Sequence, residues 1–302
     1  MSRTVVIALD GSDLSMQALP FAQTIAFQWP ARLVLVHAAD AHGGQAEALL
    51  ENELRELVRR LLEQGIDASA EVRAAAAALL ITDVARERTA DLIVMASHQR
   101  HGPNRWLNGS VAEEVLARSP IPLLVMPAHS EPSKTGAMRV LVPFDGSVVG
   151  EAALEFLRGW STVRPLELVV VRVVSNRPVL EGMDPGVVVQ PLSDEDIQAE
   201  VNDASDYLAW LVATLHETQM VARYSVIESA DRVANVIVET ARSEGVDIIA
   251  LGTHARAGIS RLVLGSQSEE VLEHSPVPVL LVRRQSARSN ASIALNKVDA
   301  RP

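Results

Sequence analysis

The chain has 302 residues, with 38 acidic and 27 basic side chains and no cysteine, so its formal net charge is −11. This composition excludes a disulfide framework and thiolate chemistry, and it argues against electrostatic capture of nucleic acid or an anionic membrane surface. The length predicts two domains of about 150 residues each. No apolar run approaches the roughly 18 residues of a membrane span, and no signal-peptide pattern is seen, so we expect a cytoplasmic protein.

The two halves of the chain repeat the same sequence blocks in the same order. Val5–Ser12 matches Val140–Ser147, and Leu33–Ala38 matches Leu168–Val173, each at an offset of 135 residues. Three later blocks match at an offset of 156 residues, namely Asp91–His98 with Asp247–His254, Asn108–Val115 with Leu264–Val271, and Ser119–Val125 with Ser275–Leu281. Such self-similarity indicates a duplicated unit.

The duplication predicts the domain organisation. We expect a first unit over residues 1–128, a linker over 129–136, a second unit over 137–284 and a disordered tail over 285–302. The offset grows by 21 residues after the second block, which predicts an insertion near 175–193. The proline and glycine content of that segment is typical of a loop.

Each unit alternates short apolar runs with helical patterns. The apolar runs are continuous, which is typical of parallel strands buried on both faces. Residues Gln45–Gln64 and Asp194–His216 are predicted as matching helices. The first of them is amphipathic, with Glu51–Arg55 and Glu56–Arg60 pairs on its exposed side and an apolar stripe formed by Leu50, Leu54, Leu57, Val58, Leu61 and Leu62.

The last strand of each unit begins with Ser-Pro-Ile-Pro or Ser-Pro-Val-Pro. Pro120 and Pro122, like Pro276 and Pro278, remove backbone donors from one side of the strand, which favours an edge position. Each unit is therefore predicted as β-α-β-α-β-α-β-α-β. This is an α/β, doubly wound, Rossmann-like fold with a five-stranded, mainly parallel sheet flanked by helices.

Ligands of doubly wound folds bind beyond the carboxyl ends of the strands, where the strand order reverses. Asp-Gly-Ser follows the first strand of both units and begins at Asp10 and Asp145. These residues either cap the next helix or contact a ribose or base, and the residues alone leave both interpretations open.

A second candidate region follows the fourth strand of each unit. It ends in Gly-Ser, which is typical of a helix N-terminus with serine as the cap and with free amide groups that attract phosphate. The preceding loop contains two arginines in each unit, Arg100 and Arg105 in the first and Arg256 and Arg261 in the second. They indicate an anion site, although solvated loop arginines have the same pattern.

The remaining signals assign no catalytic residue and no metal. His98 and His101 have a spacing compatible with a metal site, but Ala257 replaces the second histidine in the second unit and no third ligand is evident. His37 ends a strand, and Arg172 takes its place in the second unit, which argues against a shared catalytic role. No phosphate-binding loop, dinucleotide fingerprint or nucleophile elbow is present in the sequence.

The segment from Gly252 to Ser266, followed by Glu-Glu-Val-Leu-Glu-His-Ser-Pro-Val-Pro, resembles the universal stress protein family. The resemblance covers 1–128 and 137–284 and implies a tandem member that binds ATP. The implied nucleotide-binding residues of the second unit are Asp145, Val173, Gly252, Thr253, His254, Arg256, Arg261, Gly265 and Ser266. Those of the first unit are Asp10, Ala38, Ser97, His98, Gly109 and Ser110.

The two units depart from the family's glycine pattern to different extents. Ala255 replaces one glycine of the phosphate segment in the second unit, whereas Ala96 and Gln99 replace two glycines in the first. Loss of a glycine that needs positive φ or close phosphate approach costs about 1 kcal/mol. We therefore expect the second unit to be the ATP site.

The leading hypothesis is a non-catalytic, ATP-binding stress-response protein. ATP binds with or without Mg²⁺ under this hypothesis, and AMP and cyclic AMP are the alternative nucleotides. The resemblance also implies that the two units pair through their last strands, and it leaves open a homodimer and an unknown protein partner. Two rival hypotheses are an interaction scaffold that binds no nucleotide and a slow ATP hydrolase.

Overall fold

The computed structural model describes residues 3–40, 43–96, 111–127, 137–161, 166–176, 193–217, 220–253 and 265–284. The predicted linker (129–136), the predicted tail (285–302) and most of the predicted insertion (177–192) lie outside these residues. In the described part of the chain, no helix is both long enough and apolar enough to cross a membrane.

The first unit has the predicted alternation of strands and helices. Its strands are β1 (Arg3–Ala8), β2 (Ala31–Ala39), β3 (Ala68–Ala74), β4 (Leu92–Ala96) and β5 (Leu123–Met126). Its helices are α1 (Asp13–Met16), α2 (Ala18–Gln28), α3 (Gly44–Glu63), α4 (Ala77–Glu87) and α5 (Val111–Arg118). The helix predicted at Gln45–Gln64 is confirmed as α3, shifted by one residue at each end.

The second unit repeats this alternation. Its strands are β6 (Met138–Pro143), β7 (Leu166–Ser175), β8 (Val221–Ser229), β9 (Ile248–Thr253) and β10 (Val279–Arg283). Its helices are α6 (Val148–Ser161), α7 (Asp194–Glu217), α8 (Val233–Ser243) and α9 (Ser266–His274). The prediction of a helix from Asp194 to His216 is confirmed by α7. Helix α7 has 24 residues, whereas α3 has 20, so part of the additional sequence of the second unit lies in this helix.

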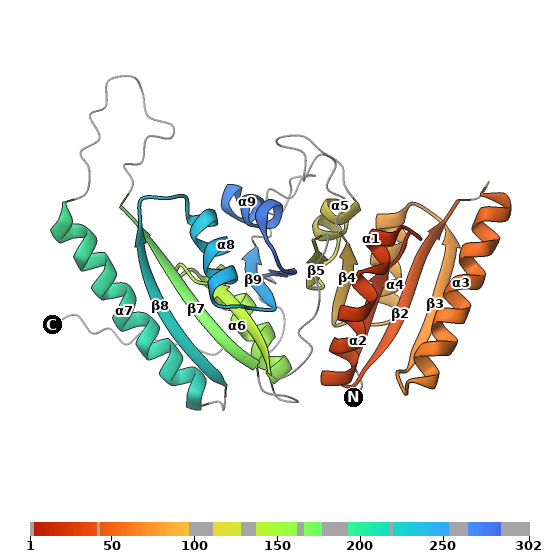
Figure 1. Ribbon diagram of the computed structural model, residues 1–302, viewed down its shortest axis with the longest axis horizontal. Coiled ribbons are helices and arrows are strands. Elements are labelled where there is room, and N and C mark those ends of the chain that lie inside the picture. The colour runs from red at the N-terminus through yellow and green to blue at the C-terminus, as the bar shows by residue number, and fades with distance from the viewer. Residues whose placement is uncertain are drawn as a thin grey trace, which may run out of the picture.

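The ten strands found in the described part of the chain form one sheet, in the order β3-β2-β1-β4-β5-β10-β9-β6-β7-β8 (Figure 1). Within each unit the strands are parallel, and the order reverses between β1 and β4 and between β6 and β9. The predicted α/β, doubly wound fold class is confirmed. The carboxyl ends of β1 and β4, and of β6 and β9, are therefore the two positions where such a fold binds ligands.

The last strands of the two units pair with each other, as the family resemblance implied. β5 and β10 run antiparallel, with Leu124 opposite Leu280 at the centre of the pairing. These two leucines occupy matching positions of the repeat, so the contact has the isologous form of a two-fold symmetric dimer. The prolines precede each strand, as expected at the start of an edge strand. The edge strand of one unit is thus covered by the edge strand of the other.

A second contact between the units lies at the ends of α2 and α6. The indole nitrogen of Trp29, which is 1% exposed, donates a hydrogen bond of 2.6 Å to the carbonyl of Trp160. The two indole rings are 4.8 Å apart, and the Arg3 guanidinium lies 5.3 Å from the Trp160 ring. The sequence analysis did not identify this cluster.

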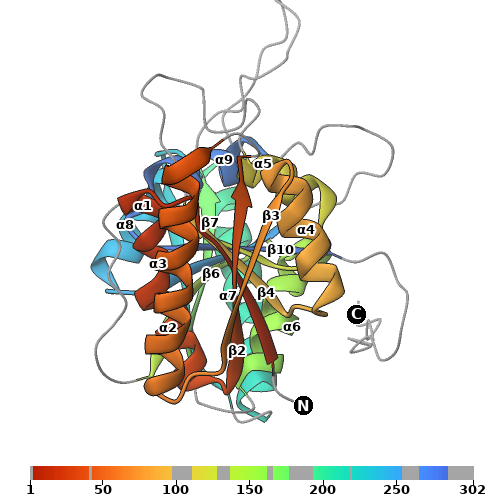
Figure 2. The ribbon, with the colours of Figure 1, turned by 90° about the vertical axis from the view of Figure 1, so that its right-hand side faces the viewer.

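Helices cover both faces of the sheet, which gives three layers (Figure 2). One large core cluster contains residues of both units on the side of α2, α3, α6 and α7, and a second contains residues of both units on the side of α4, α5, α8 and α9. Both clusters continue across the β5–β10 pairing, so the two units share their hydrophobic core.

Helix α3 differs from its prediction in two details. Leu62 was placed in the apolar stripe but is 52% exposed, because the packed face rotates away from it toward the buried Leu57 and Leu61. Glu56 pairs with Arg59, not with Arg60, while the predicted Glu51–Arg55 pair is present. Residues three and four positions apart are both neighbours on a helix surface, so the sequence does not decide which of the two arginines pairs with Glu56.

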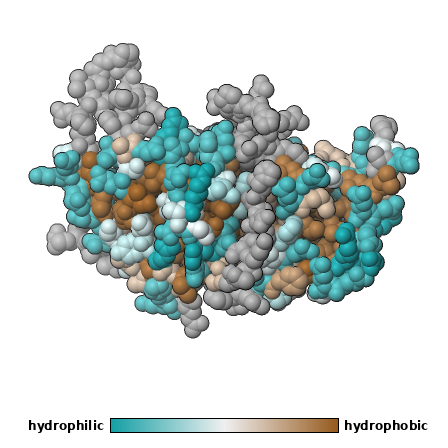
Figure 3. All heavy atoms as spheres, in the orientation of Figure 1, coloured by the Kyte–Doolittle hydropathy of each residue, from teal (hydrophilic) through white to brown (hydrophobic). Residues whose placement is uncertain are grey.

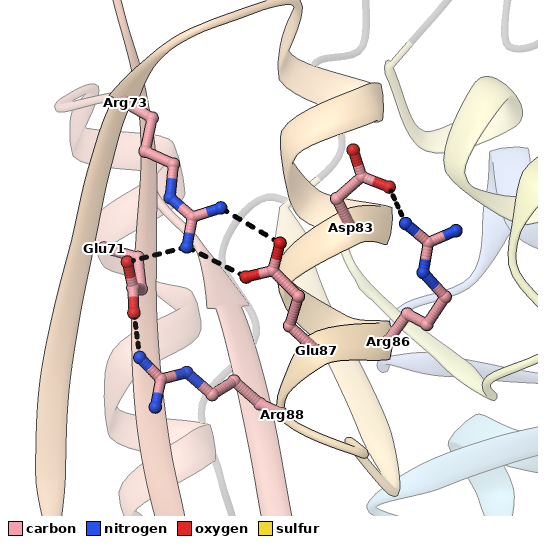
Figure 4. Close-up of polar contacts among 6 residues, drawn as sticks. All are labelled: Glu71, Arg73, Asp83, Arg86, Glu87 and Arg88. Carbon is pink, nitrogen blue, oxygen red and sulfur yellow. Dashed lines mark hydrogen bonds and ion pairs between the residues drawn. The ribbon is translucent and has the colours of Figure 1, made fainter.

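The outer strand β3 is flanked by a charged network (Figure 4). Arg73 bonds to Glu71 at 3.1 Å and to Glu87 at 2.9 Å, and Arg88 also bonds to Glu71. The guanidinium groups of Arg88 and Arg73 lower the pKa of Glu71, more than offsetting its burial. Charged side chains at an outer strand discourage pairing with another chain.

Candidate functional site

The candidate site of the second unit is the region beyond the carboxyl end of β6, where doubly wound folds form a ligand-binding crevice. β7 continues beyond its last pair with β6, Pro143–Val171, and pairs with β8 alone as far as Ser175. The amide of Phe144 donates to the Val171 carbonyl, so the peptide groups of Val171 point toward β6. Backbone direction alternates along a strand, so the amide and carbonyl of Val173 point the same way, above the end of β6. They face the crevice.

The turn that contains Asp145 forms one wall of this crevice. Gly146 has φ of +80°, a conformation that favours glycine, and the Ser147 amide donates 2.9 Å to Asp145 Oδ1. Burial raises the pKa of Asp145, but hydrogen bonds involving Ser147 and the backbone, together with Arg172, bring it below its ordinary value. The carboxylate is therefore ionised and part of it reaches solvent, so it can accept bonds from a ligand.

The matching turn of the first unit has similar geometry. Gly11 has φ of +80°, and both the amide and the hydroxyl of Ser12 donate to Asp10 Oδ1, at 2.9 and 2.6 Å. Ser12 in turn accepts a bond from the Ser15 amide and is the N-cap of α1. Of the two open interpretations, capping thus applies to Ser12, while Asp10 shapes the turn. Ala38 has the same backbone direction as Val173, because Leu9 donates to Val36.

Gly252 has a structural role that the sequence analysis did not anticipate. A Cβ placed there would lie 1.9 Å from the carbonyl oxygen of Val149, so α6 can approach β9 only because residue 252 has no side chain. The first unit has Ala96 at this position, and its helix is divided into α1 and α2. The glycine is needed for helix packing, whatever it contributes to phosphate access.

Thr253 ends β9 with its side chain on the opposite face from α6. The residue is only 4% exposed, and its Oγ1 has no hydrogen-bond partner among the residues that the structure describes. A buried hydroxyl without a partner costs about 1–3 kcal/mol. Such a group at the carboxyl end of a strand at the order reversal marks a position that a polar ligand atom can satisfy.

The start of α9 differs from its prediction. Ser266 was expected to cap the helix, but it is the first helical residue, and Gly265 is the N-cap with no side-chain bond to the helix. The capping position has extended φ and ψ, which glycine adopts readily. The first amide groups of α9 are therefore not capped by a side chain of the N-cap residue, which leaves the end of the helix suited to an anion.

Several predicted site residues lie outside the described residues, and their positions stay predictions. They are Ser97, His98, Gly109 and Ser110 of the first unit and His254, Arg256 and Arg261 of the second. The structure brings together Asp145, Val173, Gly252 and Thr253 around the ends of β6, β7 and β9.

An apolar surface adjoins the crevice on the side of α8. It includes Val173, Ile227 and Val233, which are partly buried against the core. Figure 3 shows hydrophobic residues over β7 and β8 beside α8 in the same view as Figure 1. An apolar surface next to backbone groups that face away from the neighbouring strand suits an aromatic base, which needs one face for stacking and one edge for hydrogen bonds.

Arg172 and His37 were not assigned to a site from the sequence, yet each contacts the residues around the aspartate turn of its own unit. Arg172 donates to the Asp145 carbonyl at 2.6 Å, and His37 lies 2.9 Å from the Leu9 carbonyl. Their matching positions in the repeat were a usable signal. The difference in residue type obscured this signal, because arginine is always a cation that only donates hydrogen bonds, whereas a neutral histidine also accepts them.

The strand order 3-2-1-4-5 in each unit, with an aspartate-containing turn at the order reversal, defines a tandem doubly wound protein of the class whose ligands bind at that crevice. The model of the universal stress protein family matches residues 1–127 and 137–283. The chain belongs to the universal stress protein family.

Two of the proteins similar to this chain match it over nearly their whole length. A universal stress protein of Mycobacterium tuberculosis is 27% identical over 93% of this chain and 97% of its own length. The crystal structure of a universal stress protein from Archaeoglobus fulgidus has a TM-score of 0.70 and 20% identity, and the match covers 94% of this chain and 97% of that chain. A universal stress protein solved in complex with cAMP matches 41% of this chain and 94% of that chain, with 29% identity and a TM-score of 0.35.

Proposed function

We propose that this protein binds ATP in the crevice of the second unit and acts as a nucleotide-responsive stress protein without a dedicated catalytic site. The proposal takes 137–284 as the binding unit and 1–128 as its partner within the chain. The observation that carries it is the buried Thr253 hydroxyl without a partner at the end of β9. A ligand oxygen or nitrogen at that point would supply the missing hydrogen bond.

The neighbouring residues fit the parts of a nucleotide. The Val173 peptide groups would hold the edge of the base over the apolar surface, and the Asp145 carboxylate would accept hydrogen bonds from the ribose hydroxyls. The uncapped end of α9 would face the phosphates. Arg256 and Arg261 would neutralise phosphate charge, and Mg²⁺ would supply further positive charge if it is bound with the nucleotide.

Replacement of Thr253 by valine tests this proposal. Valine keeps the shape of the side chain in a strand and removes the unpaired hydroxyl, so the ligand-free protein should keep or gain stability. Its affinity for ATP should fall about tenfold, which corresponds to about 1.4 kcal/mol. Isothermal titration with ATP, AMP and cyclic AMP gives the affinities, and chemical denaturation gives the stability.

Two aspartate variants form a matched control. Asp145→Asn keeps the turn, because an asparagine oxygen still accepts from the Ser147 amide, but it removes the charge. It should weaken ATP binding, whereas Asp10→Asn should not. If the wild-type protein shows no binding heat at about 1 mM nucleotide, a concentration that detects binding free energies as weak as about −4 kcal/mol, the proposal is wrong.

The scaffold hypothesis gains support from one observation. Gly252, which the family resemblance assigned to phosphate access, is explained by the approach of α6 alone. A protein that keeps its fold but has lost nucleotide binding would keep this glycine. The titration described above separates the two functions, since a scaffold shows no heat with any of the three nucleotides.

A further inference from the structure

Two neighbouring aromatic side chains of α7 reach the surface of the second unit. Tyr207 is partly exposed and stacks on Phe144, with ring centroids 5.8 Å apart. Trp210, one turn further along α7, is 46% exposed, and its ring centroid lies 5.7 Å from that of Tyr207. Single apolar side chains are common on protein surfaces, whereas adjoining ones mark interaction sites. The two rings therefore form a candidate contact surface.

Carboxylates without a partner surround these rings. Seven of the 24 residues of α7 are acidic, and none is lysine or arginine. On α6, the Glu151 carboxylate is near enough to Tyr207 that it adds to the effect of burial and raises the pKa of the tyrosine. Four carboxylates of this region form no salt bridge with a residue that the structure describes, namely Glu151 and Glu155 of α6 and Asp203 and Asp206 of α7. We call these four residues, with Tyr207 and Trp210, the α6–α7 surface.

The first unit has no such surface on its matching helix. The buried leucines of α7 match those of α3 in order, Leu208 with Leu54, Leu211 with Leu57 and Leu215 with Leu61. With this match, Glu53 and Glu56 of α3 take the places of Tyr207 and Trp210. Helix α3 also neutralises most of its acids, because Arg55 and Arg59 pair with glutamates of the same helix. The fold therefore requires neither the exposed rings nor the unpaired carboxylates of the second unit.

The α6–α7 surface suits a basic occupant with apolar side chains. Like charges one turn apart on a helix repel each other, and a cation over an aromatic ring is attracted to its face. The only basic residue of α6, Arg158, is in the last turn, whereas Glu151 is in the first. One segment outside the described residues has the complementary chemistry. Residues 285–302 contain one acid, Asp299, three bases, Arg288, Lys297 and Arg301, and the apolar Ile293, Leu295 and Val298.

This segment starts close to the α6–α7 surface. The Arg284 amide donates to the Thr253 carbonyl at 3.3 Å, and the residue before Thr253, Gly252, adjoins Val149 in the first turn of α6. Adjacent helices are about 8–10 Å apart and one helical turn is about 5 Å long, so a path from there to Trp210 is about 20 Å. Nine residues lead from Arg284 to Ile293 and span about 30 Å when extended. Residues 293–298 can therefore reach the rings.

We propose that residues 285–302 dock on the α6–α7 surface of the same chain, with the apolar side chains against Tyr207 and Trp210 and the basic side chains beside the carboxylates. A segment predicted to lack regular structure can bind in this way, because a few side chains supply the contacts. The docked segment lies behind the Asp145 turn, since Phe144 precedes Asp145 and stacks on Tyr207. This contact goes beyond nucleotide binding by the second unit and does not depend on it.

Fluorescence quenching in the full-length protein tests the proposal. The chain has no cysteine, so Ser292→Cys can be labelled at a single position with bimane, a small dye that tryptophan quenches on contact. A segment that is docked for at least about half of the time should lower the emission about twofold relative to the labelled protein that also has Trp210→Leu. Trp106→Leu is the matched control and should leave the quenching unchanged. Equal emission with and without Trp210 would overturn the proposal, and so would relief of quenching by Trp106→Leu alone.

Charge and concentration give a second readout that leaves both rings in place. Asp203→Asn with Asp206→Asn should relieve the quenching, whereas Glu195→Gln with Glu217→Gln, which removes the same charge from the ends of α7, should not. Raising the salt concentration from about 0.1 M to about 1 M shortens the Debye length from about 10 Å to about 3 Å and should relieve the quenching as well. Equal effects of the two double variants, or no effect of salt, would contradict charge-guided docking. Quenching that increases over an about hundredfold range of protein concentration would assign the contact to a second copy and overturn docking within one chain.

Discussion

Replacing Gly252 by alanine should destabilise the second unit. The added Cβ would lie 1.9 Å from the Val149 carbonyl oxygen and 2.5 Å from its carbon, whereas Cβ atoms essentially never approach closer than 3.0 Å. The backbone of α6 must therefore retreat by about 1 Å, and overpacking of this kind costs about 1–3 kcal/mol. The obstacle is backbone and not a flexible side chain, which favours the upper end of that range. The intrinsic gain of about 0.5–1 kcal/mol for replacing a strand glycine offsets part of it. We expect a net loss of about 2 kcal/mol.

Gly159→Ala is the matched control in the helix that must move. Nothing lies within 4 Å of a Cβ at Gly159, and the residue is helical, so alanine should stabilise the protein by up to about 1 kcal/mol. Urea denaturation should give opposite signs for the two variants, and the melting temperature of Gly252→Ala should fall by about 4–8 °C. A Gly252→Ala protein as stable as the wild type would show that α6 does not depend on this glycine.

Three further predictions concern the contacts between the units and the outer edge of the sheet. Trp29→Phe removes the donor to the Trp160 carbonyl and should lower the free energy of unfolding by about 1–3 kcal/mol. Urea denaturation measures this change, and an unchanged value would mean that the 2.6 Å hydrogen bond does not stabilise the protein. Leu280→Asp buries an unpaired charge in the β5–β10 pairing and should cost about 3 kcal/mol or more, with a larger radius of gyration in small-angle scattering; a compact, stable variant would contradict this. Arg88 and Arg73 lower the pKa of Glu71, so the stabilisation from Glu71 is present above its unfolded pKa of about 4.3 and is lost as the pH falls through the folded pKa. Glu71→Gln should therefore flatten the dependence of the free energy of unfolding on pH at acidic pH. Identical pH profiles for the wild type and the variant would refute the assignment.

Local patterns were sufficient for most of the fold. Continuous apolar runs identified buried parallel strands, and the amphipathic pattern placed α3 within one residue of its observed ends. The Asp-Gly-Ser segments were interpreted only as helix caps or ligand contacts, and the structure adds that Gly11 and Gly146 adopt positive φ. The paired prolines predicted edge strands. These features depend on neighbours in the chain, so the sequence contains the information directly.

The candidate site was only partly predictable, because its groups come from segments distant in the chain. The Val173 backbone position came from the family resemblance, and the reason for it is that β7 outruns β6. No sequence pattern reveals that Thr253 lacks a partner, since this depends on everything packed around it. The same holds for the two contacts of the His37 ring, because Leu9 and Glu47 belong to other elements of the fold.

The sequence by itself determined a duplicated, doubly wound α/β protein with an aspartate turn in each unit, because repeats, apolar runs and turn residues are properties of contiguous residues. Only the tertiary structure showed that Gly252 allows α6 to pack close to β9 and that Trp29 and Trp160 connect the two units. It also showed that His37 and Arg172 each contact a glutamate of the following helix. Each of these depends on a distance between elements far apart in the chain. Packing sets such distances, and no local pattern specifies them.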